Sequence, residues 1–166
     1  MAGLSSFDCE GVLTIGGISM NRAAWAVVGD ETGSGGLLPL WVQTEQRGQD
    51  RLLPGAVGVI AYRRRETVTR HDLRILVVGD VDQAGTPVAN AAQGLAANLA
   101  YLETNVVQPT NQTDGTRTAT LTVPGLATRS ATVHVLGLIP TTYRLNSAGS
   151  IFIGTLQISI PSGRFV

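Results

Sequence analysis

The chain contains no lysine: all twelve of its basic residues are arginine, and twelve acidic residues balance them. Its formal net charge is zero, so no overall field attracts nucleic acid or an anionic membrane surface. A P-loop is excluded, because that phosphate-binding loop requires a lysine. The use of arginine fits a GC-rich coding sequence and also forked contacts at protein interfaces, and both explanations stay open.

Cysteine, aromatic residues and long apolar runs are also scarce. Cys9 is the only cysteine, which excludes a disulfide within this chain and a cysteine-based metal cluster. No window approaches the roughly 18 to 20 apolar residues of a membrane span, and the first residues lack a signal-peptide pattern. We therefore expect a protein that folds in a reducing cytosol and does not insert into membranes.

Aromatic residues make up 5% of the chain, too few for an extended face of stacked rings that binds carbohydrate. Trp25 and Trp41 are the candidates for such a face. Tryptophan is large, mostly buried and enriched at interfaces, so each is predicted to be an anchor of the core or of a subunit interface.

Length and composition favour one domain built mainly from strands. The 166 residues, 43% of them apolar, suit a single domain over residues 1–166 with one sizeable core. Twenty glycines and a charged fraction of 14% are typical of tight turns and short strands. Alternation and turn signals predict strands at residues 10–19, 23–28, 56–62, 67–78, 118–123, 128–138 and 151–160. Residues 29–36 are a predicted loop, and so is Arg47-Gly48-Gln49-Asp50-Arg51 within the polar segment 43–54.

One helix is predicted, over residues 88–105. Leu95, Leu99, Leu102 and Val106 follow one another at offsets of four, three and four, which places them on one face. Pro87 is expected near the first turn, where its missing N–H costs nothing. A helix with one apolar stripe must lay it on a sheet. The predicted fold class is therefore α+β: an antiparallel β-sandwich or curled sheet packed by one main α-helix.

Catalytic patterns are weak. His71 and His134 lie in predicted strands, and Asp72, the neighbour of His71, points to the opposite face and cannot orient it. Asp80 and Asp82 are simply explained as a turn that ends a strand. We predict no catalytic, cofactor or metal site and no enzymatic activity. A small hydrolase that depends on Asp80, Asp82 or His71 stays open as a rival.

The charged segment before the long strand 67–78 is a predicted subunit interface. The run of three arginines has little support as a nucleic-acid patch, because only Tyr62 supplies an aromatic neighbour. A solvated strand end and an ion pair with an acidic residue of a neighbouring copy are both open. The predicted interface residues are Trp41, Arg47, Asp50, Arg51, Arg63, Arg64 and Arg65. Exposed strand edges could continue the sheet into that neighbour and close a ring.

The order of these parts resembles that of the distal tail proteins of siphophages and, more loosely, of the tail-tube proteins that share their fold. The matching features are Gly48-Gln49-Asp50, Pro54-Gly55, Arg64-Arg65 before the strand 68–78, Gly79-Asp80-Val81-Asp82, the helix, the strands of residues 118–138 and Ile158-Ser159-Ile160-Pro161. The resemblance implies a phage tail-tube-like fold and a structural virion protein that forms a hexameric ring at the distal end of the tail.

The resemblance also implies partners and a location. The tail tube protein would lie on one side of the ring and the tail hub or tip proteins on the other. The lumen would pass the tape-measure protein and later DNA, in a virion tail assembled in the cytoplasm of the host bacterium. A tail-tube or tail-terminator ring protein, a carbohydrate-binding β-sandwich module and a plain α+β domain are the open alternatives.

Overall fold

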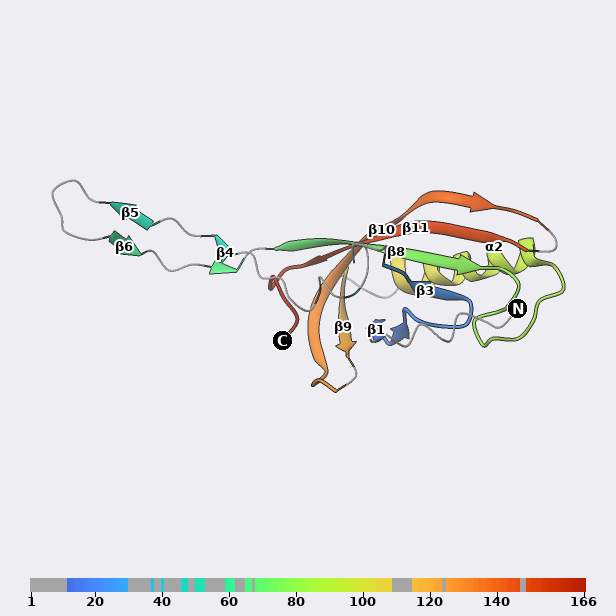
Figure 1. The fold of residues 1–166 in the computed structure, drawn as a ribbon, viewed down its shortest axis with the longest axis horizontal. Coiled ribbons are helices and arrows are strands. Elements are labelled where there is room, and N and C mark those ends of the chain that lie inside the picture. The colour runs from blue at the N-terminus through green and yellow to red at the C-terminus, as the bar shows by residue number, and fades with distance from the viewer. Residues whose placement is uncertain are drawn as a thin grey trace.

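The computed structural model describes residues 12–29, 37, 40, 46–47, 50–52, 59–61, 65–66, 68–108, 115–123, 125–146 and 149–166. In this part of the chain, seven strands form one sheet and every pairing is antiparallel (Figure 1). From edge to edge, the strands are β2 (Ile18–Ser19), β1 (Val12–Ile15), β9 (Thr116–Thr122), β10 (Arg129–Arg144), β11 (Ile151–Ile160), β8 (Thr69–Val78) and β3 (Trp25–Val27). The prediction of an α+β chain with a mainly antiparallel sheet is confirmed.

Strict alternation fixes the two faces of the central strands. On β8, Leu73, Ile75 and Val77 are buried, while Arg70 and Arg74 are exposed. β11 pairs with the whole length of β8, and its buried residues alternate in step with those of β8 as far as Ile158. A one-residue slip would move every apolar side chain to the solvent face, so the core specifies this register.

β10 is longer than its sequence predicts and belongs to two parts of the sheet. Its residues 129–134 pair with β9, and its residues 134–144 pair with β11. The strand was predicted to end at Leu138, but it continues through Pro140 to Arg144. The register shifts between Val135 and Gly137 and again between Pro140 and Thr142, and bulges of this kind bend a strand. Figure 1 shows the bend between the two halves of β10.

The helix is α2 (Ala91–Leu102), and it continues as a π-helical turn, η1 (Glu103–Val107). The side-chain oxygen of Asn90 accepts the N–H groups of Ala92 and Gln93 at 3.0 and 3.3 Å, which caps the first turn. The helix begins three residues later than predicted, because Pro87 instead forms a bridge with Val81. No helix in the described part of the chain has both the length and the apolar character to cross a membrane.

α2 packs tightly on the turn that follows β8. A Cβ on Gly94 would overlap the carbonyl oxygen of Gly79, and one on Gly79 would overlap the carbonyl of Ala91. Beside this contact, the buried amide of Asn98 donates to the carbonyls of Val78 and Val81, both at 2.9 Å. Backbone contact and two hydrogen bonds therefore fix the helix against the sheet.

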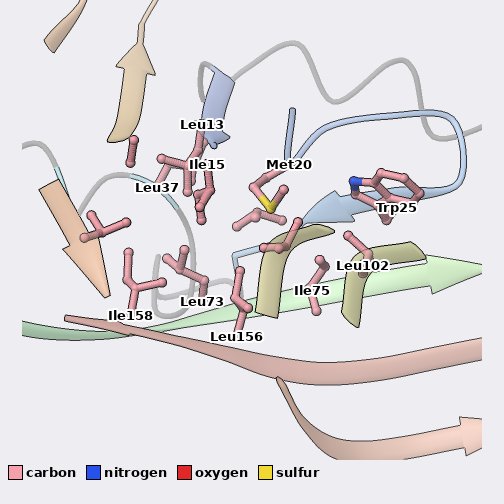
Figure 2. Packing of buried hydrophobic residues seen from close by; sticks show 14 of the residues in the cluster. Leu13, Ile15, Met20, Trp25, Leu37, Leu73, Ile75, Leu102, Leu156 and Ile158 are labelled. Atoms are coloured by element: carbon pink, nitrogen blue, oxygen red, sulfur yellow. The ribbon is translucent and has the colours of Figure 1, made fainter. Parts of the chain in front are cut away.

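The core lies between the sheet and α2. Figure 2 shows Leu13, Ile15, Leu73, Ile75 and Leu156, from three different strands, converging on one apolar space. Leu95 and Leu102 are buried in this core as predicted, and Leu99 packs at its border.

Trp25 is a core anchor, one of the two roles predicted for it. Its side chain is fully buried and its ring stacks on that of Tyr101 with 5.8 Å between the ring centroids. The indole N–H donates to the carbonyl of Ser19 at 3.0 Å, so the one polar group of this side chain is satisfied.

Replacing Gly94 with alanine tests the contact between α2 and Gly79. Helix propensity alone favours alanine by about 1 kcal/mol, whereas a collision with backbone costs about 2 kcal/mol or more. We expect the free energy of unfolding, measured with urea, to fall. The control is Gly149→Ala, because a Cβ at Gly149 meets nothing within 4 Å. A Gly94→Ala variant at least as stable as the wild type would contradict this packing.

Candidate subunit interface

The predicted interface residues lie only partly within the described chain. Trp41, Arg63 and Arg64 are outside the described residues. The remaining four lie in short strands: Arg47 in β4 (Gln46–Arg47), Asp50 and Arg51 in β5 (Asp50–Leu52), and Arg65 in β7 (Arg65–Glu66). The prediction of a polar loop over residues 47–51 is therefore wrong at Arg47, Asp50 and Arg51, which lie in strands.

These strands form two antiparallel ribbons beyond the start of β8. β4 pairs with β7, with Arg47 opposite Arg65, and β5 pairs with β6 (Val59–Ala61), with Arg51 opposite Ile60. Figure 1 shows the ribbons projecting away from the seven-stranded sheet. The predicted strand 56–62 is confirmed at β6. An isolated two-stranded ribbon is marginally stable. A ribbon of this kind gains stability when another surface packs on it.

The second half of β10, residues 135–144, is the longest unpaired strand edge in the described part of the chain. β9 ends its pairing at His134, and beyond that point β11 is the only strand neighbour among the described residues. The side chains of Leu136, Ile139 and Tyr143 are 50%, 50% and 68% exposed. Backbone hydrogen-bonding groups and apolar side chains are thus presented to solvent on the same segment.

The chemistry of this edge differs from that of a protected one. Natural edge strands commonly carry charges that oppose pairing with another chain, but residues 135–143 contain no charged side chain. Proline is tolerated in a strand mainly at an edge, and Pro140 lies in this half. Leu145 and Ile151, beside the end of the strand, are also more than two-fifths exposed. The edge is suited to accept another strand.

The sequence analysis missed this edge, although a signal for it is present. The predicted strand ends at Leu138, two residues before Pro140, and proline weakens a central strand. However, Thr141, Thr142 and Tyr143 follow this proline, and β-branched and aromatic residues favour strands. A strand signal on both sides of a proline is typical of an edge strand.

His71 and Asp72 lie on opposite faces of β8, as predicted. His71 is buried on the inner face, opposite Ile158, and Asp72 is exposed and accepts a hydrogen bond from Gln157 Nε2 at 3.0 Å. Burial lowers the pKa of His71, and the nearby charge of Asp72 opposes this with a smaller effect. His71 therefore lies in the core, with Asp72 facing away from it.

Asp82 stabilises the turn between β8 and α2. Its carboxylate accepts the N–H groups of Thr86 and Ala84 at 2.8 and 2.9 Å. The hydrogen bond from Thr86 has the largest effect and lowers the pKa of Asp82; desolvation opposes it, and the hydrogen bond from Ala84 lowers the pKa further. Asp80 contributes a backbone carbonyl, which accepts the N–H of Val88 at 2.9 Å. In the alternative that this chain is a small hydrolase, Asp82 is one of the proposed catalytic carboxylates, and its oxygen already accepts two hydrogen bonds within the turn. No group of three or more His, Cys, Asp or Glu in the described ranges could hold a metal ion.

Arg117 is a buried cation at the end of the helix. It lies on the inner face of β9 opposite Val133, with its side chain 5% exposed, and Nη1 donates to the carbonyl of Asn105 in η1. Its Nη2 has no hydrogen-bond partner among the described residues, and desolvation lowers the pKa of the guanidinium. A cation is favourable at the carbonyl end of a helix, so Arg117 anchors η1 to the sheet.

An unpaired apolar strand edge can bind another strand. Its N–H and C=O groups supply the affinity, and its side chains supply the fit. Neither His71 nor Asp82 contributes to that edge, since the first faces the core and the second lies in the turn after β8. The geometry therefore favours an interaction between chains over chemistry on a small molecule.

The chain matches no protein-family model, and a search of curated proteins finds no match either. Its function is therefore inferred from its own geometry. The unpaired half of β10 is the feature on which that inference depends.

The buried His71 predicts a loss of stability in mild acid. Its pKa is lowered from 6.5 in the folded state, so below about pH 6.5 the unfolded chain binds more protons than the folded one. Its contribution to stability is complete above about pH 6.5 and declines as the pH falls toward the lowered pKa. Urea unfolding at about pH 7.5 and about pH 5.5 should show this decline in the wild type and a smaller one in His71→Leu. Gly149→Ala is the control, because it removes no ionisable group and adds a Cβ that meets nothing within 4 Å, and it should keep the wild-type decline. An equal decline in His71→Leu would contradict the prediction.

Proposed function

We propose that this chain is a structural protein of the tail of a long-tailed bacteriophage. In this proposal it has a tail-tube-like fold and assembles head to tail into a hexameric ring at the distal end of the tail. The ring joins the tail tube protein to the hub or tip proteins, and its lumen passes the tape-measure protein and later DNA. The protein acts in the virion tail, after assembly in the host bacterial cytoplasm, and makes or breaks no bond.

The unpaired second half of β10 carries the proposal. An exposed, uncharged edge with apolar side chains is a site of pairing with another chain, and natural proteins cover or blunt such edges. Residues 135–144 have neither a covering strand among the described residues nor a charge before Arg144. A protein that works as one of many identical subunits has a ready partner for this edge in its own neighbour.

The ribbons support the same role in a second way. They project from the start of β8, away from the sheet (Figure 1). Their paired positions include Arg47, Arg65 and Arg51. Arginine makes forked contacts with carboxylates and is enriched at interfaces. We assign to the ribbons the contacts that fix the orientation of one subunit relative to another.

The alternatives differ from this proposal in testable ways. A tube or terminator ring would use the same interface at another place in the tail, so electron microscopy with the purified tube protein separates them. A carbohydrate-binding module would stay a monomer and bind glycans. Of the two tryptophans that could form its binding face, Trp25 is fully buried and cannot contact a sugar.

Substitution of Ile139 with arginine tests the interface. Ile139 is half exposed, so the free energy of unfolding should change by no more than about 0.5 kcal/mol. Charge on a pairing edge opposes association. We expect sedimentation velocity to show rings in the wild type and an assembly midpoint at least about tenfold higher in Ile139→Arg.

The matched control is Thr132→Arg. Thr132 is exposed on the same strand, but it lies in the half that is paired with β9. This variant should assemble like the wild type. A wild-type protein that remains monomeric with and without the tube protein, or an Ile139→Arg variant that assembles normally, would count against the proposal.

A further inference from the structure

We propose that the partner of the β10 edge is β8 of the next copy, at residues 69–73, and that the two strands pair in parallel. This inference rests on the proposed ring and names the two surfaces that meet in it. The proposed partner is a second copy of this chain, because one sheet carries both edges that would pair. The pairing of residues 135–144 of one copy with residues 69–73 of the next is called the joint below.

β8 presents a second unpaired edge. β3 pairs with β8 only from Ile75 to Val77, and the N–H of Val28 extends this contact to the carbonyl of Arg74. Toward its beginning, residues 69–73 have β11 on one side and no strand among the described residues on the other. The exposed positions here, Arg70 and Asp72, carry one charge of each sign.

The other outer strands are less suitable. The far edge of β3 is already occupied, because Val27 N–H donates to the carbonyl of Met20 at 3.2 Å and Arg22 N–H donates to that of Trp25 at 2.7 Å. β2 consists of two residues, which is too short for a stable set of backbone hydrogen bonds with another strand. Residues 69–73 are thus the best counterpart to β10 in the described part of the chain.

Strand direction decides the geometry of the joint. β10 and β8 are both antiparallel to β11, so they run the same way. In a ring all copies have the same orientation along the axis, so β10 of one copy and β8 of the next meet in parallel. The two edges lie at different heights, since residues 135–144 face positions 151–158 of β11 and residues 69–73 face positions 156–160. Neighbouring copies must therefore be staggered, as the tilted strands of a closed barrel are.

A two-fold dimer is the obvious competitor. It would pair β10 with β10 in an antiparallel manner, and it would leave residues 69–73 of both copies open. Head-to-tail addition instead gives both edges of every copy a partner strand, with residues 69–73 pairing with about half of residues 135–144, and closure of the ring leaves no copy with a free joint. It also places Arg70 and Asp72 beside the uncharged β10 edge, so no like charges meet.

Cysteine cross-linking tests the joint. All variants carry Cys9→Ser. Arg70→Cys is then combined in turn with Gly137→Cys, Ile139→Cys or Thr142→Cys. The residues of β11 that pair with these three positions lie on the same face of the sheet as Ser159, which pairs with Arg70. A disulfide requires Cα atoms about 4.4 to 6.8 Å apart, so three positions cover the possible registers. We expect mild oxidation of the assembled protein to give a ladder of linked chains for at least one pair. Each single-cysteine variant should give none.

Controls separate the joint from assembly itself. Arg70→Cys with Thr132→Cys, in the paired half of β10, should give no ladder. Hydrogen exchange on the unmodified protein provides a second measurement, in which residues 69–73 and the part of residues 135–144 that pairs with them should both gain protection on ring formation. Rings without a ladder and without this protection would overturn the joint and leave the proposed function standing. A rapid dimer of the Ile139→Cys variant alone would establish the two-fold pairing instead. Failure of the unmodified protein to form rings would overturn both proposals.

Discussion

The backbone hydrogen bonds of β10 change partner at His134, and the architecture depends on this change. His134 pairs with Thr116 of β9 on one side and with Ser159 of β11 on the other. Before it, β10 belongs with β9 and β1; after it, β10 belongs with β11 and β8. The bulge that follows bends the strand, so the two parts of the sheet curl around one core. Among the residues that the structure describes, the same change leaves residues 135–144 with a single neighbouring strand, and an unpaired edge is the consequence.

α2 cannot cover that edge, because its position is fixed elsewhere. Contact between Gly79 and Gly94 and the two hydrogen bonds of Asn98 hold the helix on the inner face, at the end of β8. The opposite face of β8 carries Arg70 and Arg74, which remain solvated without a covering layer. Among the described residues, what is left without a partner is therefore not a face of the sheet but two strand edges, that of residues 135–144 in β10 and that of residues 69–73 in β8. An edge is satisfied by another strand.

The sequence predicted the elements whose pattern is local. Alternation located β8, β9 and β11, and the spacing of Leu95 and Leu102 located the buried face of α2. It did not identify Asn98 as part of that face, since a polar residue is buried only when carbonyls from another segment receive its hydrogen bonds. The extension of β10 past Pro140 was also missed, because the lack of a neighbour at that point is a property of the whole sheet. Of the predicted interface, four residues fall in ribbons and three outside the described chain, so their role stays a prediction.

Pairing of strand edges between copies does not by itself fix the register of the two strands, and we assign that role to the ribbons that carry Arg47, Arg51 and Arg65. Backbone pairing along an uncharged edge is strong but poorly specified, because neighbouring registers offer nearly the same hydrogen bonds. Electrostatic contacts add little net affinity at an exposed surface, yet they exclude wrong arrangements by placing like charges together. Arg47 and Arg65 occupy paired positions in the ribbon formed by β4 and β7. In the proposed ring, the β10 edge supplies affinity and the ribbons select the one arrangement of subunits that closes.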